Sequence, residues 1–275
     1  MANLIDSASL NRVLDEGVSL IDVRYKLGGK EPNWGKQAYK KGHIPSAVYF
    51  DLNEDLSAPP KEHGGRHPLV DIDKFAKQLG DSGIDSSTKV VIYDDNAGAF
   101  AGRMWWMLKY IGHKDMMILD GGYSAWLEAK LPIETKIPNC QPCKYDLNIQ
   151  KDLLVDMEYV KANISKLAIL DARGHKRYLG QNEHLDPKAG HIPSALSFPY
   201  TDNLIDNKFK SKKELKERFK DFKKEQEIIL YCGSGVTACH NFLVLDSLGY
   251  KNLKLYIGSW SDWVSYPDNP IEIGA

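Results

Sequence analysis

Cysteine is scarce in this sequence, with four in a chain of 275 residues. Domains that rely on disulfides are dense in cysteine, so this scarcity excludes a disulfide framework. It favours a reducing compartment, and we expect a cytoplasmic protein. Cys140 and Cys143 form a Cys-x-x-Cys pair. A lone pair does not complete the coordination of a structural zinc ion, so we expect no metal site.

Long apolar runs and an excess of charge of one sign are also missing. No run approaches the ~20 residues that a membrane-spanning helix needs. The first ten residues contain Asp6 and neither the basic residues nor the apolar segment of a secretory signal. The formal net charge is −1, from 36 basic and 37 acidic side chains. We therefore expect a globular protein with no nucleic-acid or membrane partner.

The sequence does contain a cysteine at a predicted junction between a strand and a helix. The apolar run at 228–231 predicts a buried parallel strand, and the apolar spacing over 238–248 predicts a helix that ends at Gly249. Cys232 lies between them, on a loop whose glycines allow backbone N–H groups to turn inward. The helix N-terminus adds about half a positive charge.

These features predict that Cys232 is a nucleophile, held as a thiolate by the surrounding amides. The alternative is a small buried cysteine packed at a tight turn. The predicted cradle for the anion consists of Gly233, Ser234, Gly235, Val236 and Thr237.

One order of motifs occurs twice in the chain. Each half has an apolar strand ending in Asp-x-Arg, a Gly-His-Ile-Pro-Ser-Ala turn, a second apolar strand and a third strand followed by a tryptophan-containing segment. Matching residues are separated by 149 positions from Asp22 to Asp171, 148 from His43 to His191, 138 from Tyr93 to Tyr231 and 137 from Trp126 to Trp263. Strands that alternate with helices predict a mostly parallel sheet in each half. We place the domains at 1–135 and 153–275, with a linker at 136–152.

The two halves differ at the cysteine. By the register of the repeat, Asp94 stands where Cys232 stands, and Asp95 follows it. The first half therefore lacks the thiol and puts negative charge where an anion would sit. We predict one active site in the chain, in its second half.

The first half also has about ten extra residues, because the offset falls from 148 at His43 to 138 at Tyr93. We place them in the polar, histidine-rich loop at 57–68, which includes His67. Two interpretations stay open: the loop reaches the site in the other half, or it is a surface loop with incidental histidines.

The paired Asp-x-Arg and Gly-His-Ile-Pro-Ser-Ala motifs and the single Cys-Gly-Ser-Gly-Val-Thr-Ala loop resemble the two-domain rhodanese family, the thiosulfate and 3-mercaptopyruvate sulfurtransferases. The resemblance covers nearly the whole chain and implies two tandem rhodanese-like α/β domains, each a mostly parallel sheet flanked by helices. It also implies a ping-pong reaction. Cys232 would take a sulfane sulfur from a donor, form a persulfide and pass the sulfur to cyanide or a thiol acceptor. No cofactor is expected, and a thioredoxin-like reductant is a candidate partner.

The resemblance leaves the donor open. Basic residues often follow the cysteine in thiosulfate enzymes, whereas Gly233 and Ser234 follow it here, as in the mercaptopyruvate type. In that type the serine belongs to a Ser-His-Asp arrangement, and the resemblance matches Ser234 to the serine and His67 to the histidine. The aspartate position is Asn53, a departure.

A pair of arginines clamps the substrate carboxylate in the mercaptopyruvate type, and Arg177 matches the first of them. The second would fall near Asp186, where this sequence has no arginine. His184 or Lys188 could stand in, with a poorer fit to a planar bidentate contact. The signals therefore point in both directions, and we take thiosulfate as the broader assignment of the donor.

Two other functions are compatible with a reactive cysteine. A cysteine phosphatase of related fold needs an arginine six positions after the cysteine, and Ala238 occupies that position. A binding module could instead receive a persulfide from a partner protein without using small donors.

Overall fold

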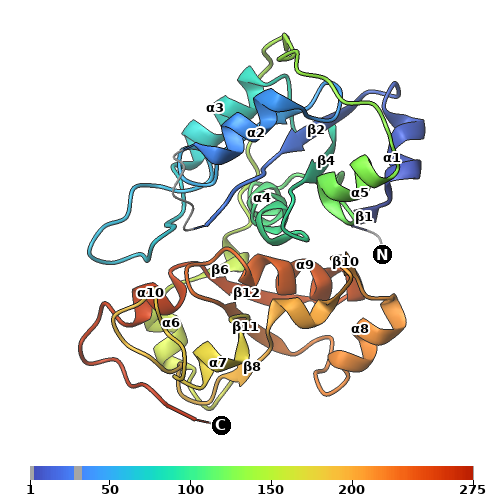
Figure 1. Cartoon of the computed structure of the whole chain (residues 1–275). Coiled ribbons are helices and arrows are strands. Elements are labelled where there is room, and N and C mark those ends of the chain that lie inside the picture. Colours follow the sequence, from blue (N-terminus) through green and yellow to red (C-terminus); the bar gives the residue numbers. More distant parts are fainter. Residues whose placement is uncertain (1–2, 28–32, 275) are drawn as a thin grey trace. The chain divides into compact units, whose positions relative to one another are not determined.

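The computed structural model describes residues 3–27 and 33–274, and the chain forms two compact units (Figure 1). The first unit consists of Met1–Ala58, Val70–Gln150 and Asp206–Phe209, and the second of Pro59–Leu69, Lys151–Ile205 and Lys210–Ala275. The loop at 59–69 therefore packs with the second unit, although it lies in the first half of the sequence. The boundaries 1–135, 136–152 and 153–275 stay a prediction.

The first unit is built on a five-stranded parallel sheet with the strand order β1-β5-β4-β2-β3. Its strands are β1 (Leu4–Ile5), β2 (Val18–Asp22), β3 (Val48–Tyr49), β4 (Lys89–Tyr93) and β5 (Met116–Leu119). Its helices are α1 (Ser7–Val13), α2 (Trp34–Lys41), α3 (Ile72–Asp81), α4 (Ala99–Tyr110) and α5 (Gly122–Glu128).

The second unit repeats this topology, with the strand order β6-β12-β11-β7-β8 and all pairs parallel. Its sheet consists of β6 (Leu154–Val155), β7 (Ala168–Asp171), β8 (Leu196–Ser197), β11 (Glu227–Tyr231) and β12 (Asn252–Tyr256). Its helices are α6 (Met157–Ala162), α7 (His175–Tyr178), α8 (Lys212–Arg218), α9 (Ala238–Leu248) and α10 (Ser259–Trp263), with 3-10 turns η1 (Lys151–Leu153) and η2 (Tyr200–Asn203). Two further short strands are β9 (Leu204–Ile205), in the second unit, and β10 (Lys208–Phe209), which belongs to the first. The predicted tandem α/β repeat is confirmed.

The central strands are buried on both faces, as the apolar runs in the sequence indicate. Residues 90–93 of β4 and 228–231 of β11 have no exposed surface, which is typical of parallel strands covered on both sides by helices. Trp126 and Trp263 are equally buried and occupy matching positions: each indole N–H donates to a proline carbonyl six or seven residues later. Trp263 is therefore a core residue.

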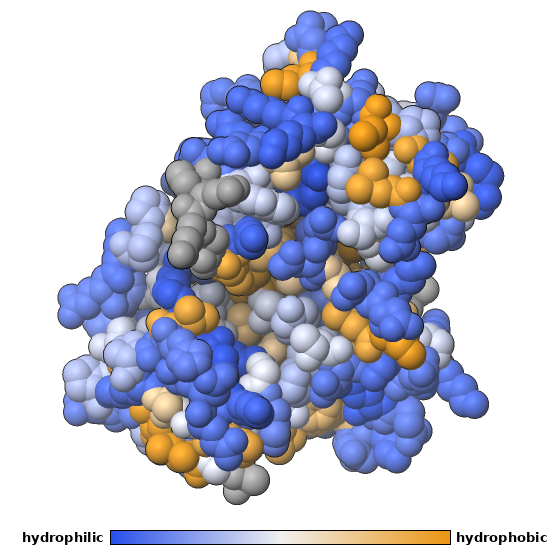
Figure 2. Space-filling view, in the orientation of Figure 1, coloured by the Kyte–Doolittle hydropathy of each residue, from blue (hydrophilic) through white to orange (hydrophobic). Residues whose placement is uncertain are grey.

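Hydrophilic residues cover most of the face drawn in Figure 2, where hydrophobic residues lie in small separate groups. This distribution is ordinary for a protein surface in water. No helix among residues 3–27 and 33–274 is long and apolar enough to span a bilayer.

The Asp-x-Arg motif ties a strand end to the following turn in both units. The Arg173 guanidinium donates to the Asp171 carboxylate at 2.6 Å and to the Gly190 carbonyl at 2.7 Å. Arg24 makes the same pair of bonds, at the same two distances, to Asp22 and Gly42. All four charged side chains are almost fully buried. These residues hold the fold together, which is the role expected of buried charges that are fully paired.

We predict that Arg24→Met strongly destabilises the first unit, because the Asp22 carboxylate would stay buried without its partner. Removal of one member of a buried ion pair costs about 3–5 kcal/mol of unfolding free energy. The double variant Asp22→Asn/Arg24→Met should lose clearly less, since no uncompensated charge remains. Urea unfolding followed by tryptophan fluorescence measures both, and equal losses in the single and double variants would contradict this role.

Candidate active site

Cys232 lies immediately after β11, at the carboxyl edge of the second sheet, where open α/β sheets place their ligands. Its backbone N–H donates to Ser259 Oγ at 3.1 Å, and its carbonyl accepts from the Trp260 N–H at 3.0 Å. The Gly233 carbonyl accepts from the Ser261 N–H at 2.9 Å. The start of α10 therefore fixes the backbone on which the thiol sits, and 2% of Cys232 is exposed.

The loop after Cys232 turns as its glycines predict. Gly235 has a φ of +73°, and a Cβ there would lie 2.2 Å from the Ile257 carbonyl oxygen, so no other residue fits. The helix that follows begins at Ala238 and ends at Leu248, with Gly249 in the left-handed conformation, as predicted.

This loop presents backbone N–H groups that the protein does not use. Within the described residues, five of these groups donate to no acceptor, and four of the five residues are buried. A buried N–H without a partner is rare and costs free energy comparable to a lost hydrogen bond, so such a group calls for a ligand. The five N–H groups belong to Gly233, Ser234, Val236, Thr237 and Ala238.

The corresponding loop of the first unit holds an anionic side chain on its backbone N–H groups. The Asp94 carboxylate, in the register position of Cys232, accepts four backbone N–H groups at 2.8–3.0 Å, from Asn96, Gly98, Phe100 and Ala101. Burial raises the pKa of the Asp94 carboxyl, although the four N–H groups act in the opposite direction. The neighbouring Asp95 points away and accepts from Ser124. The loop thus holds one anion, and in the first unit a side chain supplies it.

The loop at 59–69 is fastened to α10 of the second unit. The Gly64 N–H donates to Asp262 Oδ1 at 2.6 Å, and the Arg66 N–H donates to Ser261 Oγ at 3.1 Å. The His63 ring stacks on Tyr266 with a centroid separation of 4.0 Å. Of the two interpretations left open by the sequence, the structure supports the loop that reaches the second half.

This loop brings His67 to the candidate site. His67 Nδ1 and Ser234 Oγ share a hydrogen bond of 2.7 Å, and both side chains are buried. The predicted Ser–His pair therefore exists in the structure. Asn53, at the position expected for an aspartate, belongs to the first unit and donates to the Tyr25 hydroxyl.

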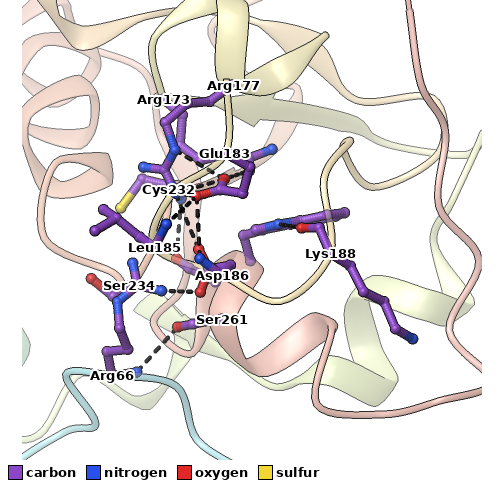
Figure 3. A network of polar contacts seen from close by, with 12 residues as sticks. Arg66, Arg173, Arg177, Glu183, Leu185, Asp186, Lys188, Cys232, Ser234 and Ser261 are labelled. Atoms are coloured by element: carbon purple, nitrogen blue, oxygen red, sulfur yellow. Dashed lines mark hydrogen bonds and ion pairs between the residues drawn. The ribbon is translucent and has the colours of Figure 1, made fainter. Parts of the chain in front are cut away.

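The cysteine loop itself carries no cation, but the structure places two arginines beside it (Figure 3). A Cβ on Gly233 would lie 3.0 Å from Arg66 Nη2 and 3.2 Å from Arg177 Nη1. The substrate-binding role of Arg177 stays a prediction, and Arg66 was not singled out in the sequence. The signal available in the sequence was its position next to His67, in a loop already suspected of reaching the site.

Buried carboxylates hold both arginines. Arg177 donates to Glu183 at 2.9 and 3.0 Å and to Asp186 Oδ2 at 3.1 Å, and Arg66 pairs with Asp186 Oδ1. Burial raises the pKa of the Glu183 carboxyl, but hydrogen bonds from the Leu185 N–H and Arg177 outweigh burial and leave this pKa below its usual value. Burial and the Glu183 charge raise the pKa of Asp186 despite the nearby arginines.

Other tryptophan and cysteine side chains of the chain have structural positions. Trp260 is fully buried in the core, where its indole N–H donates to the Lys188 carbonyl. Cys239 is also buried and its thiol lies 3.2 Å from the Gly235 carbonyl oxygen. Cys140 and Cys143 are free thiols. In the part of the chain that the structure describes, no group of three or more candidate ligands could hold a metal ion.

Comparison with known proteins gives one consistent result. The family model "Rhodanese-like domain" matches residues 6–129 and 156–266. A probable 3-mercaptopyruvate sulfurtransferase from Pseudomonas aeruginosa is 39% identical, over 96% of this chain and 95% of its own. A thiosulfate sulfurtransferase from Cricetulus griseus is 31% identical, over 96% and 89%. The crystal structure of the 3-mercaptopyruvate sulfotransferase SseA from Escherichia coli aligns with a TM-score of 0.84 and 30% identity, over 95% of this chain and all of the other.

We predict that Asp94→Asn destabilises the first unit by about 2–3 kcal/mol, because an amide cannot accept from four N–H groups and loses the charge that strengthens these bonds. Asp95→Asn is the matched control, since this exposed neighbour should change stability by less than about 0.5 kcal/mol. Urea unfolding of the two variants measures the difference. Equal stabilities would show that the carboxylate in the loop is not a structural anion.

Proposed function

This chain belongs to the rhodanese family, and from that premise we propose that it is a sulfurtransferase whose Cys232 accepts a sulfane sulfur from a small donor. The cysteine holds the sulfur as a persulfide and passes it to cyanide or a thiol. We further propose that a thioredoxin-like reductant serves as an acceptor and that the protein works in a reducing cytosol.

The observation that carries this proposal is the contrast between the two anion loops. In the first unit the Asp94 carboxylate occupies four backbone N–H groups. In the second unit the loop has a thiol in that register position, and the described residues offer no acceptor for its five N–H groups. Amides at a helix N-terminus stabilise a thiolate, and a persulfide anion has the same requirement one atom farther out.

The chemistry balances for both donors. With thiosulfate, the Cys232 thiolate forms a sulfur–sulfur bond to the outer sulfur and the bond to the sulfonate sulfur breaks, so that sulfite leaves with the electron pair. With 3-mercaptopyruvate, the thiolate attacks the donor thiol sulfur and the carbon–sulfur bond breaks. The electron pair then goes to the enolate of pyruvate, and the thiol proton ends on carbon. Only the second reaction needs a proton to move.

The Ser234–His67 pair supports 3-mercaptopyruvate as the preferred donor, in place of the broader thiosulfate assignment made from the sequence. A hydrogen-bonded hydroxyl and imidazole can carry the proton that this donor must transfer. The 2.7 Å bond between them gives the pair the geometry of a proton relay. Arg177 lies beside Gly233, the residue that follows Cys232, and would hold the donor carboxylate.

Incubation with either donor, followed by removal of the donor and intact-mass measurement, should show a gain of one sulfur atom. The gain should disappear in Cys232→Ser and persist in Cys140→Ser, which removes an unrelated thiol of the first unit. A protein that gains sulfur only when a partner protein is present would be a carrier module instead. Cys232-dependent hydrolysis of an aryl phosphate without any sulfur gain would favour a phosphatase.

His67→Ala should lower kcat/KM for 3-mercaptopyruvate about a hundredfold, since general acid–base catalysis contributes about 10²–10⁴-fold. For thiosulfate the effect should be severalfold at most, because no proton moves. His175→Ala, which removes an exposed histidine of the same unit that bonds Ser197, serves as the control. Steady-state kinetics with both donors measures the ratio, and equal losses for the two donors would remove His67 from proton transfer.

A further inference from the structure

The two arginines beside Gly233 each have a terminal nitrogen that is not used in their ion pairs. Arg66 pairs with Asp186 through Nη1, and Arg177 pairs with Glu183 and Asp186 through Nε and Nη2. Within the described residues, Arg66 Nη2 and Arg177 Nη1 donate to no acceptor. These are the two atoms nearest to the position of a Cβ on Gly233. Two cationic donors therefore converge at the residue that follows the thiol, where glycine leaves room.

The charges around this point cancel in the protein alone. The network contains three arginines and three carboxylates, joined by the ion pairs and hydrogen bonds drawn in Figure 3 and those at Asp171, so its formal charge is zero. Its members are Arg66, Arg173, Arg177, Asp171, Glu183 and Asp186. An anionic donor thus meets a site whose attraction depends on how firmly each carboxylate neutralises its arginines.

The three carboxylates are held differently. Asp171 accepts the backbone N–H of Arg173 as well as its guanidinium, and Glu183 accepts the N–H groups of Leu185 and Asp186. The Asp186 carboxylate is bound by Arg66 and Arg177 alone among the described residues, with no backbone donor. It is also buried, with 2% of the side chain exposed against 32% for Arg66. Asp186 is therefore the carboxylate whose only function in the network is to offset these two arginines.

We propose that Asp186 is a specificity-determining residue, which lowers the positive charge presented by Arg66 Nη2 and Arg177 Nη1 and so disfavours dianionic donors relative to monoanionic ones. This inference rests on the proposed function and names the charge class of its substrate. Coulomb energy scales with the product of the charges. Removal of the Asp186 charge therefore strengthens the binding of a dianion by the square of the factor by which it strengthens the binding of a monoanion.

Removal of the Arg66 charge should have the opposite effect on donor binding to removal of the Asp186 charge. Arg66 comes from the 59–69 loop, whose backbone is held by Ser261 and Asp262 independently of the guanidinium. Arg66→Gln should therefore leave the loop in place and weaken donor binding, most strongly for the dianion. This half-exposed side chain also provides a variant that folds if Asp186→Asn does not.

The first experiment compares KM for thiosulfate, a dianion, with KM for 3-mercaptopyruvate, a monoanion. In Asp186→Asn the KM for thiosulfate should fall about tenfold and the KM for 3-mercaptopyruvate about threefold. Arg66→Gln should raise both KM values, and the KM for thiosulfate should rise more. Asp268→Asn makes the same charge change at an exposed position of the second unit and should leave the ratio unchanged. Equal changes for the two donors in Asp186→Asn would overturn the proposal.

The second experiment reports on the charge without requiring sulfur transfer. Cys232 is alkylated with iodoacetate, which is anionic, and with iodoacetamide, which is neutral, and the two rates are measured by mass spectrometry. The rate with iodoacetate divided by the rate with iodoacetamide should rise severalfold at Cys232 in Asp186→Asn and fall in Arg66→Gln. The same ratio at the exposed Cys143 should stay constant. An unchanged ratio at Cys232 in both variants overturns the role of Asp186. Failure of the wild-type protein to form a persulfide would instead overturn the proposed function.

Discussion

Backbone N–H groups to which residues 3–27 and 33–274 offer no acceptor are the feature on which the candidate active site depends. A buried amide without a partner costs free energy, and the loop after β11 carries several of them. An anion placed among them would accept several of these N–H groups at once. The conformation that creates this demand depends on Gly235, whose positive φ and contact with the Ile257 carbonyl exclude any side chain.

The two units of the duplicated chain differ in the side chain that stands beside these N–H groups. In the first unit the Asp94 carboxylate accepts hydrogen bonds from the amides of its own loop, so the chain itself supplies the acceptor. In the second unit Cys232 takes the register position of Asp94, on a loop that differs in sequence and in its glycine positions. The proposed function assigns this thiol a charge and an attached sulfur that change during the reaction.

The surroundings of the thiol combine this strong, local stabilisation with a balanced set of side-chain charges. Amides at a helix N-terminus favour negative charge close to them, which is the basis of the role proposed for Cys232. The arginines beside Gly233 are partly neutralised by Glu183 and Asp186, so they provide directional donors without a large positive potential. Such an arrangement suits an enzyme that binds a charged substrate and must then release an anionic product.

The sequence by itself determined the strand–loop–helix around Cys232, the tandem order of the two units and the replacement of the thiol by Asp94, because periodicity, glycine position and register are local or repeated signals. It did not determine where the 59–69 loop packs, since a loop without apolar periodicity carries no information about its partner. Only the tertiary structure therefore joined His67 to Ser234 and brought Arg66 to the position where a second arginine was sought near Asp186. It also decided which amides stay without acceptors, because hydrogen-bond satisfaction is a property of the packed chain.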